Sequence, residues 1–178
     1  MLNELMQLSD WARSLVIMGA ALVAGVIFET IILSRFKQIA DRTHWEGDNI
    51  IYNALRGITT LWFVIGGLYF ASLGSPIPPH FLRPLHHTLL IIVIFSATFV
   101  VSRIAVDLIS LYSSKAPGIV PATSIFGNMA KLLIFAIGTL IILQTLGISV
   151  TPLLGALGVG GLAVALGLQA TLANLFSG

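Results

Sequence analysis

Charged residues are scarce in this sequence, and cysteine is missing altogether. Of its 178 residues only 9% are Asp, Glu, Lys or Arg, whereas 57% are hydrophobic. A soluble domain carries about 25% charged residues, so this chain has too few to cover a surface that faces water. Its natural solvent is therefore lipid.

Other absences exclude further classes of protein. Without cysteine the chain can form no disulfide and supports no thiolate chemistry. No run of Lys and Arg indicates nucleic acid as a partner, and neither a phosphate-binding glycine loop with adjoining Lys nor an HExxH motif is present. We expect no enzyme activity, no metal site and no cofactor.

Long hydrophobic runs predict the fold class. A bilayer core about 30 Å thick needs roughly 20 helical residues, and helices satisfy their own backbone groups where lipid cannot. We predict an all-α integral membrane protein with five transmembrane helices in each subunit. The expected spans are residues 14–33, 54–73, 87–111, 125–146 and 152–178.

The chain is expected to have three parts. Residues 1–124 hold three peripheral, lipid-facing spans, 125–151 hold the fourth span and a tight turn, and 152–178 form the last helix. The first span follows Glu4 and Asp10 rather than a basic segment, so we interpret it as permanent and not as a signal peptide.

Basic residues indicate the orientation in the membrane, because they prefer the cytoplasmic side. The link after the first span carries Arg35, Lys37 and Arg42, whereas the next link carries only Arg83. We expect a multi-pass protein of the inner (cell) membrane, with its N-terminus outside and Gly178 in the cytoplasm.

The last span has small residues on two sides of one apolar face. At about 100° per residue, Leu162 and Leu166 share a face, with Gln169 near the same line. The flanks are Gly158, Gly161 and Ala165 on one side, and Ala156, Gly160, Ala163, Gly167 and Ala170 on the other. A closed ring of identical helices needs two such flanks, since each helix contacts two neighbours and small residues permit close approach.

In such a ring Leu162 and Leu166 would line the central axis and form an apolar constriction that closes by dewetting. Two plainer interpretations stay open. The leucines could be ordinary lipid-facing or core residues, and the small residues could pack against the fourth span within a monomer.

A few polar side chains lie within or beside the other spans. Arg103 and Asp107 are four residues apart and predict a local ion pair, or else a contact with lipid headgroups or the pore helix. Glu29 is expected near the interface, beside Arg35, with a proton-relay role as the alternative. His80, His86 and His87 are interpreted as interfacial residues rather than metal ligands.

The stretch 158–178, GVGGLAVALGLQATLANLFSG, resembles the pore helix of the small-conductance mechanosensitive channel (MscS) family. The resemblance places the hydrophobic seal at Leu162 and Leu166. It places pore-helix packing at Gly158, Gly160, Gly161, Ala163, Ala165 and Gly167. The family's helix bends after the glutamine, at a glycine that is Ala170 here, so the hinge candidates are Gln169, Ala170 and Gly178.

The resemblance further implies a homo-heptamer and a cytoplasmic vestibule after the pore helix, which this chain lacks. It predicts a weakly selective channel that membrane tension opens, releasing solutes in hypo-osmotic shock. The expected partners are membrane lipids, permeant ions and small solutes, and identical subunits. The alternatives are a ligand-gated member of the same family, a secondary transporter, or a non-conducting assembly.

Overall fold

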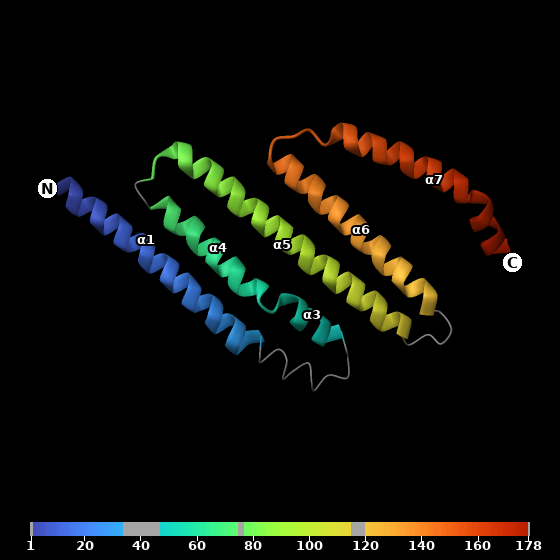
Figure 1. The fold of residues 1–178 in the computed structure, drawn as a ribbon, viewed down its shortest axis with the longest axis horizontal. Coiled ribbons are helices and arrows are strands. Elements are labelled where there is room, and N and C mark those ends of the chain that lie inside the picture. The colour runs from blue at the N-terminus through green and yellow to red at the C-terminus, as the bar shows by residue number, and fades with distance from the viewer. Residues whose placement is uncertain (1, 34–46, 75–76, 115–119, 178) are drawn as a thin grey trace. The chain divides into compact units, whose positions relative to one another are not determined.

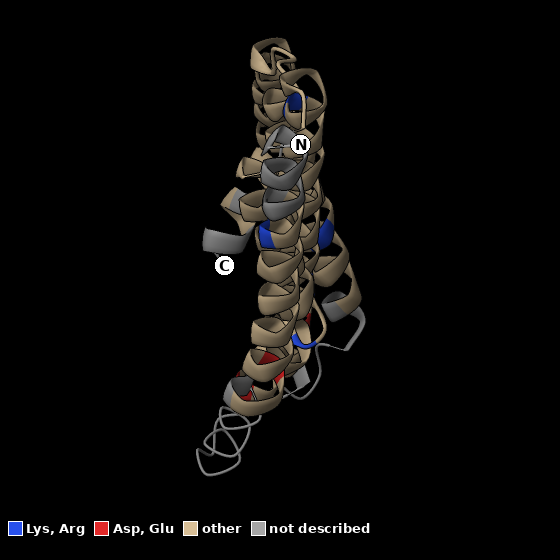
Figure 2. Cartoon of the chain, turned by 90° about the vertical axis from the view of Figure 1, so that its left-hand side faces the viewer, with Lys and Arg blue, Asp and Glu red and all other residues tan. Residues whose placement is uncertain are grey.

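A computed structural model describes residues 2–33, 47–74, 77–114 and 120–177 of the chain, and every regular element in this described part is helical. By its internal contacts the chain divides into two units, Met1–Ile142 and Leu143–Gly178. Few residues along the helices are charged (Figure 2). These observations confirm the all-α membrane fold class.

The first unit is a layer of helices (Figure 1). Helix α1 (Leu2–Ile27) continues into a π-helical turn, η1 (Phe28–Leu33), and α3 (Gly47–Leu55) is followed by α4 (Ile58–Leu73). The long α5 (Pro79–Ser114) and α6 (Val120–Thr145) follow. Helix α1 packs on α4, and α4 packs on α5.

Four helices are long and apolar enough to cross a membrane, and the bent pair α3–α4 makes a fifth if it forms one span. The second span therefore departs from the continuous helix expected over 54–73. Its two helices meet at 42°, because Gly57 adopts a left-handed conformation, with φ of 84°, immediately before α4. Glycine adopts such a φ without the steric cost that a Cβ imposes.

Helix α5 starts at Pro79 rather than near His87, where the third span was expected to begin. Pro84 lies inside this helix. Proline removes one backbone hydrogen bond, but membrane helices tolerate this when neighbouring groups satisfy the freed backbone. The carbonyl that Pro84 leaves without its usual donor is that of His80, four residues earlier in the first turns of the helix.

Small residues bring the helices of the first unit together. A Cβ added at Gly67 of α4 would collide with Ala21 of α1, and one added at Gly138 of α6 would collide with Thr98 of α5. In lipid no hydrophobic effect drives helices together. Close packing of small residues contributes to their association instead. These helices can thus approach so closely only because glycine has no side chain at the two positions.

Candidate pore-lining helix

A glycine turn joins α6 to the helix that was expected to line a pore. Gly147 has φ of 80°. Its N–H donates to Gln144 O at 3.0 Å, and the Ile148 N–H donates to Leu143 O at 3.0 Å. This pattern is a Schellman motif, which ends a helix by satisfying its last carbonyl groups. The chain then re-enters a helix after only a few residues.

The final helix, α7 (Thr151–Ser177), has no interruption. It begins with the Leu154 N–H donating to Val150 O at 2.9 Å, and Pro152 lies in its first turn, where no internal N–H partner is needed. Every residue from Thr151 to Thr171 is exposed. An apolar helix exposed on all faces requires cover from lipid or from other helices.

The two predicted seal residues lie on one face of α7. Leu162 is 65% exposed and Leu166 is 68% exposed. Four residues of α-helix span about 6 Å along the axis, so the two side chains are stacked one turn apart. No charged residue and no histidine occurs between Thr151 and Gly178. This face can exclude water, but it offers no acid, base or metal ligand.

Both flanks of this face are open. A Cβ added at any glycine of α7 tested would meet no other atom within 4 Å, and these glycines are Gly155, Gly158, Gly160, Gly161 and Gly167. Ala163 and Ala165 are also exposed. On the opposite face, helical geometry groups the larger Leu157, Val164 and Leu168. The small flanks therefore have the shape of packing surfaces.

The structure describes two of the three hinge candidates. Gln169 and Ala170 are exposed and lie within the continuous helix, whereas Gly178 lies outside the described residues. Figure 1 shows that α7 curves near its C-terminal end without losing its helical form. Alanine is a good helix former, which agrees with a helix that is unbroken at Ala170.

The polar residues of the earlier spans lie in the first unit. Arg103 is exposed and Asp107 is half-buried, both on α5, and their ion pair stays a prediction. His80 packs its ring on Phe81 with centroids 4.2 Å apart. Among the described residues, no group of three or more His, Cys, Asp or Glu side chains could hold a metal ion. Arg35, Lys37, Arg42 and Lys115 lie outside the described residues.

Glu29 has a role that the sequence did not reveal. Its carboxylate accepts a hydrogen bond from the Gly57 N–H at 3.0 Å through Oε1 and another from the Thr60 hydroxyl through Oε2. Glu29 thus caps the start of α4 from a different helix. A carboxylate there satisfies an unpaired backbone donor and opposes the positive end of the helix dipole. The expected position of Glu29 near the interface, beside Arg35, stays a prediction, because Arg35 lies outside the described residues.

A π-helical turn places Glu29 where it can reach α4. The turn covers Phe28–Leu33, and π-helical turns are rare and often occur at functional positions. The ring of Phe28 packs against that of Phe63 on α4, with centroids 5.3 Å apart. The sequence signal for this contact was a single acidic residue, Glu29, near the end of an apolar span. Its partners Gly57 and Thr60 follow 28 and 31 residues later.

Comparison with known proteins agrees with this geometry. Residues 128–169, which include most of α6 as well as Leu162 and Leu166, match the family described as mechanosensitive ion channel, transmembrane helices 2/3. The large-conductance mechanosensitive channel MscMJLR of Methanocaldococcus jannaschii is 26% identical over 153 residues, 80% of this chain and 42% of that protein. Both likenesses support a mechanosensitive ion channel family. They point to a multi-pass membrane channel rather than an enzyme.

The comparisons also have bounds. The chain spans less than half the length of the curated relative that it matches. No solved structure matches it. The relative is named a large-conductance channel, so the resemblance to the small-conductance family stays a prediction.

Proposed function

We propose that this chain is the membrane part of a tension-gated channel in which α7 lines the pore. The observation that carries this proposal is the continuous helix α7, in which the face of Leu162 and Leu166 lies between two flanks of glycine and alanine. A single neighbouring helix would cover one flank. A ring of identical subunits covers both flanks and turns the leucine face inward.

The closed state is then a stack of two leucine rings. A narrow pore lined by apolar side chains holds water poorly, and ions do not cross it without their hydration shell. Because α7 carries no charged side chain, the constriction would select weakly between cations and anions. Permeant ions and small solutes are the expected cargo.

Tension would open the pore by favouring the state with the larger area in the membrane plane. The first unit supplies the lipid-facing helices that could tilt and move α7 outward. The hinge candidates Gln169, Ala170 and Gly178 are the places where α7 would bend as the leucine rings separate. The N-terminus would lie outside the inner membrane and the C-terminus in the cytoplasm.

Finer features rest on the resemblance of residues 158–178. They are the small-conductance subfamily, a homo-heptamer, a cytoplasmic vestibule beyond Gly178, and solute release in hypo-osmotic shock. The ion pair of Arg103 and Asp107 would stabilise two charges within the membrane. Together these features describe a channel that membrane tension alone opens and that then releases solutes.

The test is patch-clamp recording of the full-length protein in liposomes of defined lipid under stepped suction. Discrete conductance that rises with tension, without any added ligand, is the expected result. Folded and oligomeric protein that stays silent up to membrane rupture would overturn tension gating. Conductance that needs a ligand would favour the ligand-gated alternative, and ion-coupled uptake that depends on Glu29 or Asp107 would favour a transporter.

A further inference from the structure

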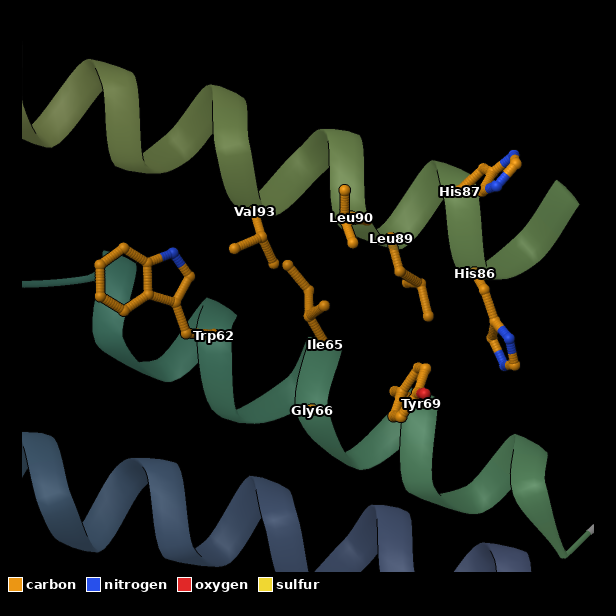
Figure 3. Close-up of a pocket in the computed structure, with 9 residues that line it drawn as sticks. All are labelled: Trp62, Ile65, Gly66, Tyr69, His86, His87, Leu89, Leu90 and Val93. Atoms are coloured by element: carbon orange, nitrogen blue, oxygen red, sulfur yellow. The ribbon is translucent and has the colours of Figure 1, made fainter. Parts of the chain in front are cut away.

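A groove between α4 and α5 is separate from the pore helix. It encloses about 550 Å³, within the range of about 300–1,000 Å³ that small-molecule sites occupy. Its apolar wall consists of Trp62, Ile65 and Gly66 from α4 and Leu89, Leu90 and Val93 from α5. Figure 3 shows Tyr69, His86 and His87 at one end and Trp62 at the other. The groove therefore grades from apolar to polar along its length.

The polar end is held in place by contacts within the protein. The Nε2 atom of His86 lies 2.7 Å from Ser72 Oγ, and Ser72 is buried at 4% exposure. The His86 ring also packs on the Tyr69 ring, with centroids 4.7 Å apart. An imidazole fixed by a hydroxyl and an aromatic ring is a positioned polar group rather than a mobile surface side chain.

The charge at this end favours an anion. Arg83 is exposed on α5, three residues before His86 and four before His87, so the three lie on neighbouring positions of one helix face. The sequence from residue 58 to residue 106 contains no Asp and no Glu. Arginine and histidine N–H groups are the usual donors to phosphate oxygens.

The width of the groove comes from Gly66. A Cβ added at Gly66 would meet no atom within 4 Å, so a larger side chain would enter empty space. In lipid such a space is filled by an acyl chain, since a membrane span has no water to fill it. The groove has a long apolar wall and an anion-binding end. A phospholipid has the two matching parts, an acyl chain and an anionic headgroup.

We propose that this groove binds one anionic phospholipid, with an acyl chain along the wall from Trp62 to Leu89 and the phosphate at Arg83 and His87, while His86 stays bonded to Ser72. The lipid would tie α4 to the first turns of α5 and so couple the layer of helices to the surrounding bilayer. This site does not depend on whether the chain conducts ions, because none of its residues belongs to α7.

Native mass spectrometry of the full chain in detergent, titrated with dioleoyl-phosphatidylglycerol and separately with dioleoyl-phosphatidylcholine, tests the site. We expect one phosphatidylglycerol per chain to be retained in preference to phosphatidylcholine. Gly66→Leu should lower its affinity about tenfold, the equivalent of about 1.4 kcal/mol. Leu90→Trp fills the same groove from α5 and should act alike.

Gly19→Leu is the matched control, because Gly19 also has no atom within 4 Å of an added Cβ but does not line the groove. It should leave lipid affinity within about twofold, a change below 0.5 kcal/mol. Arg83→Gln should reduce the preference for phosphatidylglycerol about threefold to fivefold, as expected for one exposed charge-assisted bond, and leave phosphatidylcholine binding unchanged.

Three results would overturn the proposal. One is unchanged phosphatidylglycerol affinity in both folded groove-filling variants. Another is equal binding of the two lipids, with no effect of Arg83→Gln. If Gly66→Leu instead dissociates the oligomer without changing lipid retention, a neighbouring copy occupies the groove and the lipid assignment is wrong.

Discussion

Some glycines of residues 1–142 lie at close helix contacts, whereas no tested glycine of α7 does. In the first unit Gly67 and Gly138 stand so close to Ala21 and Thr98 that an added Cβ would collide. In α7 the glycines, Gly158 and Gly160 among them, have no atom within 4 Å of an added Cβ. The first set is already used for packing within the chain, whereas the second is open to a partner outside it.

The difference separates two causes of a glycine-rich membrane helix. In water a glycine lowers intrinsic helix stability by up to about 1 kcal/mol relative to alanine, and in a membrane close helix contact can offset such a cost. The first unit shows the offset within one chain. For α7 we propose that neighbouring subunits supply this offset.

The largest expected effect is a leak caused by a polar substitution on the leucine face of α7. Leu162→Ser should make the closed channel leak, since each subunit replaces an apolar surface with a hydroxyl that holds water in the constriction. We expect the open probability at zero tension to rise at least about tenfold, which needs only about 1.4 kcal/mol. Patch-clamp recording without suction measures it, and Leu166→Ser should act in the same direction.

Leu157→Ser is the matched control for this prediction. Leu157 is also exposed, at 57%, but helical geometry puts it on the face opposite Leu162. A leak of similar size from Leu157→Ser, or none from either seal variant, would mean that the leucine face is not the pore lining.

The next effect concerns stability of the first unit. Gly67→Ala should destabilise it by about 1–3 kcal/mol, the range for overpacking a tight contact, because the new methyl group meets Ala21. Gly66→Ala changes the adjacent residue of the same helix but enters open space. Thermal unfolding in detergent should show a lower midpoint for the first variant and not for the second.

The same substitution in α7 should behave differently. Gly160→Ala enters open space in the single chain, so it should leave the unfolding midpoint of the subunit unchanged or slightly higher. Its effect should be on assembly, visible as a shifted subunit count or dissociation in native mass spectrometry. Equal destabilisation of the monomer by Gly160→Ala and Gly67→Ala would remove the contrast between the two regions.

A smaller effect is expected at the cap on α4. Glu29→Ala leaves the Gly57 N–H and the Thr60 hydroxyl without their shared acceptor, and loss of a helix cap costs about 0.5–2 kcal/mol. A double-mutant cycle with Thr60→Val should give a coupling free energy of about 0.5–1.5 kcal/mol, typical of one hydrogen bond. Additive effects in that cycle would mean that Thr60 does not share the cap.

The cap also marks where sequence reasoning reached its limit. Hydropathy located the apolar spans, and the short uncharged link predicted the turn at Gly147, because each signal is local. The break before α4 was missed because Arg56 and Gly57 adjoin an apolar run. The π-helical turn at Glu29 was missed because a single inserted residue leaves no period in the sequence, and its partner lies 28 residues away.

More of the candidate pore site than of the groove could be predicted from the sequence. A face of Leu162 and Leu166 between small flanks follows from helical periodicity within one segment. The groove at His86 needs two helices placed side by side, with Ser72 and Tyr69 of α4 beside α5. Periodicity of either helix alone does not contain that pairing.

The last prediction sharpens the comparison, because one backbone rule applies in both regions. Gly147 and Gly57 both have positive φ, of 80° and 84°, where an added Cβ costs about 1–2 kcal/mol. Gly147→Ala and Gly57→Ala should each lower the unfolding midpoint by about 2–4 °C per kcal/mol for a chain of this size. Gly155→Ala has no such φ and should raise helix stability instead. If Gly147→Ala has no effect, then the turn adopts another conformation in the assembled protein, and the start of α7 is set by its neighbours and not by the chain itself.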